Sequence, residues 1–358
     1  MTTIVESRRR LRLPSLGSAG SVLAPVVVAL LVGAVVVAVT GNDPVSIYRT
    51  LAREAFGGAD RVNATLAAAT PLLFTGLAAA FAYRAGIFTV GVEGSFVAGG
   101  LATAAIGSHM DGVVPALGIA ALLVVATFVG LVVAVLPAVL RAYARVDEVV
   151  TTLMFNFIAS GLASWSVQAF FQERGQANSA TAMVADAVRL PELAPPGQTN
   201  VGLLVALAAV AVYWWWTRST TLGFELTTVG SAPRFAVAQG LRTRLVVLVA
   251  LLGAGAIGGL AGGVHTLGIV HRFTAGFSAG FGFTGIAIAL LARFNPVGIV
   301  AAAILFGALN SAGTTAQLFI DLPIQIIDVL QGTVMVFAVA QFALPRLRKR
   351  QAVPVATT

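Results

Sequence analysis

The sequence predicts an all-α polytopic membrane protein of about ten transmembrane helices, with an inverted repeat and broken helices. Of the 358 residues, 58% are hydrophobic and only 10% are charged, and apolar runs recur along the whole chain. A helix needs roughly 20 apolar residues to cross the ~30 Å hydrocarbon core of a bilayer. Runs of this kind leave no stretch long enough for a separate soluble domain.

The expected spans follow the apolar runs and end at charged or Pro- and Gly-rich segments. They are residues 22–40, 63–83, 87–107, 113–140, 148–170, 200–217, 245–264, 282–292, 296–316 and 324–344, of which the eighth is unusually short. Together they form one transmembrane domain at 22–344. A basic N-terminal segment at 1–21 precedes this domain, and a tail at 345–358 follows it.

The first run follows the basic sequence SRRRLRL at residues 7–13, which is also compatible with a cleavable secretory or twin-arginine signal. The run is longer than a typical signal core, and no small-x-small cleavage pattern precedes Gly41, so an uncleaved span is expected. Most of the 22 Lys and Arg residues lie at span ends on one side of this topology. The positive-inside rule then places both termini on the cytosolic side of the cell membrane. Because the basic residues are scattered along the chain and not clustered on one face, nucleic-acid binding is not expected.

Two segments on the outer side are not expected to span. In the first, 41–62, apolar residues near helical spacing predict a short amphipathic helix that lies on the membrane surface or under a docked protein. Its predicted apolar face is Val45, Tyr48, Leu51 and Ala55. The second, 171–199, contains three Pro residues and predicts an outer loop that is too polar and too Pro-rich to enter lipid, with a plain connector as the simplest interpretation.

Two glycine-broken helices are expected in matching places. Gly86, Gly91 and Gly94 interrupt the segment after the second span, and a Gly-rich stretch at 276–285 follows the seventh. Unwound backbone cannot face lipid, because each unpaired N–H or C=O costs several kcal/mol there, so it must face protein or water. The flanking spans run in opposite directions, so the two breaks predict an inverted repeat around a substrate path. Close packing of small residues is the alternative for either break.

Two acidic residues are predicted at membrane depth. Glu93 lies within the first break, where a carboxylate is expensive and faces a cavity or a partner. It either contacts substrate or accepts backbone N–H groups of its own broken helix. For Asp328, in the last span, a structural pairing near the outer leaflet is the favoured interpretation.

The fifth span begins with the sequence DEVVTTLMFN at 147–156. Thr152 and Asn156 share a helix face at i, i+4 spacing. In an apolar helix, such a polar stripe either hydrogen-bonds a neighbouring helix or lines the path.

The sequence contains no motif of an enzyme. Zero Cys excludes disulfides, thiolate metal sites and thiol catalysis, and there is no Walker A, HExxH or Gly-x-Ser-x-Gly sequence. The three His residues are far apart near predicted span ends. A transport subunit is therefore predicted, with no catalytic residue, no metal site and no cofactor of its own.

A mildly polar segment, TTLGFELTTVGSAPRFAVAQGL at 220–241, interrupts the apolar runs. The preceding YWWWTR sequence suits an aromatic belt with Arg218 on the cytosolic side, so the segment at 218–244 should face the cytosol. Its Gly and Pro residues predict a shaped docking surface for a soluble partner.

Four ordered stretches carry a family resemblance over nearly the whole chain. They are FTVGVEGSFVAGG at 88–100, DEVVTTLMFNFIA at 147–159, the segment at 220–241, and the stretch RFTAGFSAGFGFTGIAIALLARFNPVGIVAAAILFGAL at 272–309. YRTLAREAFG at 48–57 adds to them. The chain resembles permease subunits of ABC importers for nucleosides and simple sugars, within the larger group of branched-chain amino acid and ribose permeases.

This resemblance implies an importer with a second permease subunit, cytosolic ABC ATPases that bind ATP and Mg²⁺, and an extracytoplasmic substrate-binding protein. The segment at 220–241 resembles the family's cytosolic coupling loop. The residues that the resemblance assigns to ATPase coupling are Gly223, Phe224, Glu225, Gly230, Pro233 and Arg234.

The sequences GVEG and EVVTTLMFN are most similar to nucleoside-type permeases, although Ser95 stands where a larger polar amide is expected. Simple sugars and branched-chain amino acids remain alternative substrates. Aromatic residues near the predicted path either stack on a nucleobase or serve only in packing. The predicted path residues are Glu93, Phe88, Gly91, Gly94, Thr152, Asn156, Phe281 and Phe283, with Phe155 as a further aromatic candidate.

Two other classes of protein compete with this interpretation. An ion-coupled secondary transporter would use Glu93 and Asp328, but it has no need for a docking segment at 218–244. A membrane scaffold or receptor has no need for paired broken helices.

Overall fold

The computed structural model describes residues 27–28, 30–35, 37–39, 43–173, 179–193, 197–320, 329, 331–333 and 335–336. The predicted N-terminal segment at 1–21, the tail at 345–358, and Asp328 lie outside the described residues, as do most of the tenth expected span and parts of the first.

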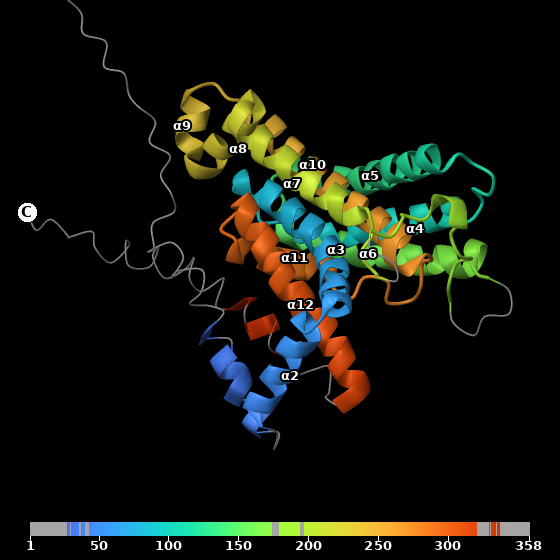
Figure 1. The fold of residues 1–358 in the computed structure, drawn as a ribbon. Coiled ribbons are helices and arrows are strands. Elements are labelled where there is room, and N and C mark those ends of the chain that lie inside the picture. The colour runs from blue at the N-terminus through green and yellow to red at the C-terminus, as the bar shows by residue number, and fades with distance from the viewer. Residues whose placement is uncertain are drawn as a thin grey trace, which may run out of the picture.

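Within this part of the chain the fold is helical (Figure 1). The α-helices are α2 (Pro44–Phe56), α3 (Ala59–Arg84), α4 (Val92–Gly107), α5 (Pro115–Val139), α6 (Glu148–Ser166), α7 (Gly202–Ser219), α8 (Thr221–Ser231), α9 (Pro233–Ala238), α10 (Thr243–His265), α11 (Phe281–Leu291) and α12 (Pro296–Ile320). Single π-helical turns extend α5, α6 and α10 at Leu140–Ala144, Val167–Phe171 and Thr266–Val270, and a 3-10 turn lies at Asp186–Val188.

The expected spans from the second to the ninth each fall on one of these helices, which confirms the polytopic all-α class. Among the described residues, five helices are long and apolar enough to cross a membrane: α3, α12, and α5, α6 and α10 with their π-turn extensions. α4 and α11 have only 16 and 11 residues. The described residues therefore do not confirm a count of ten spans.

The long helix α3 is the centre of the bundle. It contacts α7, α10, α11 and α12, and 78% of its most apolar window is buried. Phe74, Ala78 and Ala82 have no exposed surface. A helix that is apolar on all sides needs neighbours on all sides, and α3 has them.

α4, α5 and α10 pack closely through glycines. A Cβ atom on Gly259 of α10 would lie in contact with the carbonyl oxygen of Ala126 and 2.7 Å from the Cα of Gly130, both on α5. Ser95 of α4, where a larger amide was expected, donates a hydrogen bond of 3.0 Å to the Gly130 carbonyl. The Ser at this position is therefore used in packing between helices.

α2 confirms the predicted amphipathic helix, and Tyr48, Leu51 and Ala55 of its predicted apolar face pack inward, whereas Val45 does not. Ile47, Leu51 and Ala55 are buried against Val37, Ala308 and Ala312, whereas Val45 is exposed. Positions 47, 51 and 55 repeat every four residues and form one stripe, and position 45 lies on the other side of the helix. The prediction for Val45 was wrong.

Arginines gather at one end of the bundle, hereafter the basic end. The Arg84 guanidinium lies over the Tyr213 ring at 5.3 Å, and that of Arg244 lies over the Tyr143 ring at 5.8 Å. These contacts bring the ends of α3, α5 and α7 together with the start of α10. α8 and α9 project at this end (Figure 1). The grouping fits the positive-inside pattern.

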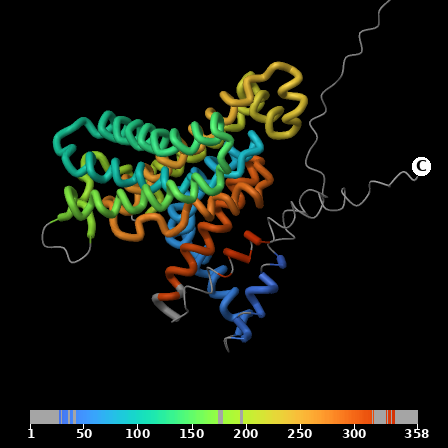
Figure 2. The backbone as a smooth tube through the Cα atoms, turned by 180° about the vertical axis from the view of Figure 1, so that it is seen from behind, coloured from blue at the N-terminus to red at the C-terminus, as the bar shows by residue number. Residues whose placement is uncertain are grey.

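The loop after α6 is more than a plain connector. Thr181 donates its backbone N–H to the Phe273 carbonyl at 3.0 Å, and Ala180 forms an isolated bridge with Thr274. Val184 and Val188 are buried in the core. The loop is therefore packed against the segment that leads into α11, and Figure 2 shows this orange segment beside the green α6.

Candidate functional site

Two irregular segments lie between helices, close to the predicted breaks. The first connects α3 to α4. We call residues 84–93 the strap, which consists of this connection, the last residue of α3 and the first two residues of α4. The second, residues 271–280, connects α10 to α11. Gly91 is the N-cap of α4. The prediction that Gly94 and Gly285 interrupt their helices was wrong: both are helical, and the lack of a side chain instead admits Asn156 beside Gly94 and Thr75 beside Gly285.

The two breaks meet at one hydrogen bond. The Gly282 N–H of α11 donates to Glu93 Oε2 of α4 at 2.7 Å, and Glu93 is only 7% exposed. The first N–H groups of any helix lack intrahelical partners, and the partial positive charge of a helix start favours an anion. The N-cap of α11 is Gly280, which has no side chain to supply that anion. Glu93 of α4 therefore caps α11, not its own helix as one alternative had it.

The junction lies at membrane depth. α11 has 11 residues, which gives a length of ~16 Å at 1.5 Å per residue. Its far end lies at the basic end, where an Arg84 Nη atom is 3.5 Å from the Phe294 carbonyl oxygen. With α11 along the membrane normal and the basic end at the membrane surface, the Glu93–Gly282 contact would lie about halfway through a ~30 Å hydrocarbon core.

Thr152 and Asn156 of α6 bind the strap. Asn156 donates from Nδ2 to the Val90 carbonyl at 3.0 Å and accepts the Gly94 N–H at 2.9 Å. Thr152 Oγ1 accepts the Val90 N–H at 3.3 Å and donates to the Glu148 carbonyl at 2.7 Å. In this conformation both side chains satisfy irregular backbone, as the interhelical alternative expects.

The predicted aromatic residues divide into packed and exposed ones. Phe281 lies in a cluster with Phe96 and His265, at ring-centroid distances of 5.6 and 5.1 Å. Phe88 stacks on Tyr83 at 5.0 Å yet remains 42% exposed. Phe283, which follows Gly282, is 39% exposed. Of these three rings, only those of Phe88 and Phe283 are exposed.

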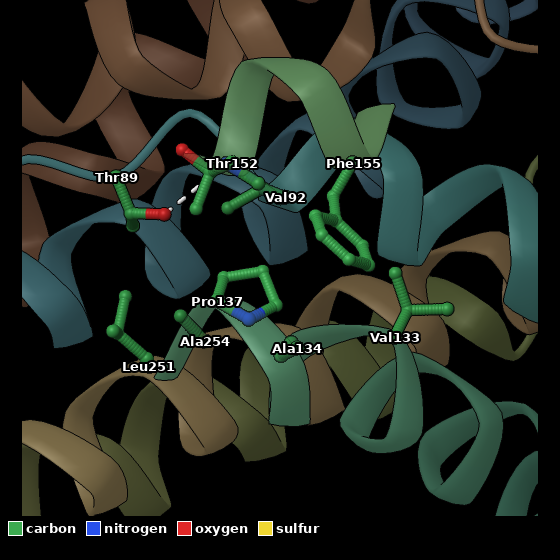
Figure 3. A pocket seen from close by; sticks show the side chains of 11 residues that line it. Thr89, Val92, Val133, Ala134, Pro137, Thr152, Phe155, Leu251 and Ala254 are labelled. Atoms are coloured by element: carbon green, nitrogen blue, oxygen red, sulfur yellow. Dashed lines mark hydrogen bonds between the residues drawn. The ribbon is translucent and has the colours of Figure 1, made fainter. Parts of the chain in front are cut away.

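A small cavity lies between the strap, α5, α6 and α10 (Figure 3). Thr89, Thr152 and Phe155 lie along one side, and Pro137, Leu251 and Ala254 lie across from them. Its volume is about 10 Å³, which is room for roughly one water molecule. A nucleoside or a sugar does not fit there in this conformation.

The docking segment forms two short helices at the basic end, α8 and α9. The Thr220 hydroxyl caps α8 by accepting the Gly223 N–H at 3.1 Å, and Gly223 is buried against the end of α7. Phe224 is 65% exposed, and Pro233 and Arg234 begin α9 on its exposed side. Gly230 is turned the other way, against the strap.

Glu225 borders a groove between α8 and the start of α10. The groove has a volume of about 440 Å³. Apolar residues line most of it, and Glu225 and Arg242 supply its charged groups; the lining is Leu222, Glu225, Gly240, Leu241, Arg242, Leu245, Val246 and Val249. Exposed apolar surface beside charge is typical of a protein-binding site.

Sequence reasoning missed a polar stripe on α6. One edge of the exposed side of this helix is apolar and carries Met154, Ile158 and Leu162. The other edge is polar and carries half-buried Ser160 and exposed Ser164 and Gln168. None of these three polar side chains makes a hydrogen bond to a described residue. The four-residue repeat of Ser160, Ser164 and Gln168 was the available signal.

The chain matches the family model described as the branched-chain amino acid transport system / permease component over residues 62–339. It is 30% identical to the guanosine ABC transporter permease protein NupP of Bacillus subtilis, covering 90% of this chain and 93% of the relative. It is 32% identical to the glucose ABC transporter permease protein TsgB13 of Haloferax volcanii, over 92% and 89%. It is 27% identical to the nucleoside ABC transporter permease protein NupB of Lactococcus lactis, over 90% and 91%. No solved structure matches the chain significantly.

Proposed function

Because this chain belongs to the branched-chain amino acid transport system permease family, we propose that it is the permease subunit of an ATP-driven importer and forms half of its translocation path. The observation that carries the proposal is the meeting of the first turns of α4 and α11 at Glu93 and Gly282, in a chain similar along most of its length to ABC permeases. Interrupted helices that meet at membrane depth are typical of transport sites.

We propose nucleosides as the substrate class. The relatives include guanosine and nucleoside permeases from two organisms, and the exposed rings of Phe88 and Phe283 suit stacking on a base. The glucose permease relative supports a simple sugar as the second candidate. Hydroxyl and amide groups at Ser160, Ser164 and Gln168 suit either solute, because both are rich in hydrogen-bonding groups.

The subunit has no ATPase motif, so its partners complete the importer. Relatives come from systems with two named permeases, NupP with NupQ and NupB with NupC, which supports a second permease beside this chain. We place the basic end in the cytosol, where α8 and α9 meet an ATPase that binds ATP and Mg²⁺. A substrate-binding protein docks at the opposite end. This chain itself binds no cofactor.

The test starts from native membranes. The chain is purified in mild detergent, co-purifying proteins are identified, and ATP hydrolysis is measured with guanosine or glucose and the cognate binding protein. We expect a second permease and an ATPase, with hydrolysis stimulated by guanosine. Stimulation by glucose alone would reassign the substrate. Solute uptake along an ion gradient by the chain alone would overturn the importer proposal.

Charge reversal at the docking groove should uncouple transport. Glu225→Lys leaves only cations in the groove, and we expect uptake to fall about tenfold or more because a partner complementary to Glu225 would then meet like charge, which costs several kcal/mol. Uptake and the amount of ATPase bound to the purified complex are measured together. Thr221→Ala, an exposed substitution on the same helix, is the control. Full uptake by Glu225→Lys would remove Glu225 from the docking surface.

A further inference from the structure

The docking helix α8 touches the strap through two glycines. Gly86 adopts φ +76°, and a Cβ atom on it would lie 3.1 Å from the Cα of Gly230. A Cβ on Gly230 would contact the Arg84 carbonyl oxygen and lie 2.7 Å from the Gly86 nitrogen. Backbone therefore meets backbone, with no side chain between to absorb a displacement. Backbone atoms cannot move aside by changing rotamer, so the contact is stiff.

The same strap holds α11 near both of its ends. At the basic end, the Arg84 side chain reaches the Phe294 carbonyl just beyond α11. At membrane depth, Glu93 accepts the Gly282 N–H from the first turn of α11. These two contacts come from the two ends of one ten-residue segment, residues 84–93. The strap and α11 thus lie alongside each other.

α6 fixes the middle of the strap. Val90 is bound through both its N–H and its carbonyl, by Thr152 and Asn156. An irregular segment whose backbone groups are satisfied in this way does not need to refold when it is pushed. It can transmit a displacement as a rigid piece.

From these contacts we propose that the strap is the coupling element between the ATPase and the translocation path: displacement of α8 moves residues 84–93 and α11 as one body, and Phe283 with them. The proposal rests on the proposed function and adds its internal transmission route. Gly86 and Gly230 act as positioning residues, because each lies against the backbone of the other segment. Motion of α8 then reaches the translocation path through the strap as well as through the flanking helices α7 and α10.

The first test is Gly230→Ala in the assembled importer. The added methyl group must push α8 away from the strap, so ATP hydrolysis should stay within about twofold of wild type while solute moved per ATP falls about tenfold. Ser231→Ala, on the neighbouring exposed residue, is the matched control and should change neither. An unchanged ratio of solute to ATP in an intact Gly230→Ala complex would overturn the proposal.

The second test does not depend on that variant. Since the chain has no Cys, Cys residues can be introduced for spin labelling at chosen positions. These are Thr227 on α8, Thr284 on α11 and Val132 on α5. We expect the distance between labels on α8 and α11 to change by less than about 2 Å on ATP binding, while the distance from α11 to α5 changes by more. A larger change in the distance between the labels on α8 and α11 would overturn the proposed role of the strap. Failure of the wild-type complex to transport would instead overturn the proposed function.

Discussion

Replacing Glu93 with Ala should reduce uptake by about 10- to 100-fold, which corresponds to the loss of a charge-assisted hydrogen bond of about 1.5–3 kcal/mol. The Gly282 N–H and the start of α11 would lose the acceptor at 2.7 Å. No side chain at Gly280 can replace it. Uptake is measured in proteoliposomes that contain the complete importer, alongside its basal ATP hydrolysis.

Graded substitutions at Glu93 separate capping from contact with substrate. Glu93→Gln keeps an oxygen that accepts the Gly282 N–H and should retain more uptake than Glu93→Ala, whereas Glu93→Asp is one methylene short and should resemble Ala. Glu54→Gln removes a carboxylate paired with Arg61 outside the junction, and should leave uptake unchanged. If Gln and Ala behave alike while the apparent affinity for solute falls, Glu93 contacts substrate instead of holding α11.

Replacing Gly259 with Leu should abolish most of the folded protein. Its Cβ would contact the Ala126 carbonyl and lie 2.7 Å from Gly130, and both of these contacts are backbone atoms of α5. Separation of α5 from α10 also disturbs α4, which packs against both helices. Overpacking of this kind costs about 1–3 kcal/mol even where side chains can adjust, and more against backbone.

The measurement is the thermal midpoint of the purified chain and its monodisperse yield. Gly161→Leu is the matched control, since a Cβ atom on Gly161 of α6 would meet no neighbouring atom within 4 Å. We expect near-normal yield for Gly161→Leu and very little for Gly259→Leu. Equal yields would show that α5 and α10 can move apart at low cost.

Apolar run length was enough to locate most helices. α5 and α12 begin at prolines that follow polar or glycine-containing stretches, and both lie within a few residues of the expected spans. Membrane helices are predictable because lipid imposes both the length and the apolar composition of a span. The helix over 44–56 was likewise predicted, and Leu51 and Ala55 of its predicted apolar face are buried, although Ile47 takes the place expected for Val45.

The contacts of the site were less predictable than its residues. Glu93, Thr152 and Asn156 were identified from polarity in apolar surroundings, which is a local property. The partner of Glu93 is Gly282, and a glycine N–H carries no sequence signal for the acceptor that it meets. The contact between Gly86 and Gly230 was hidden for the same reason, because both partners are backbone. Their roles in transport remain predictions.

The hydrogen bond from Gly282 to Glu93 joins residues 189 positions apart in the chain. At ~5–20 residues per second, a ribosome needs roughly 10–40 s to add the second residue after the first. During that time, α4 is already made and its carboxylate has no helix start to cap. A bare carboxylate in lipid costs several kcal/mol, so Glu93 must be protonated, hydrated or shielded by the insertion machinery until α11 arrives. Biogenesis of this permease therefore has a late step, in which one of its last helices completes a site begun by one of its first.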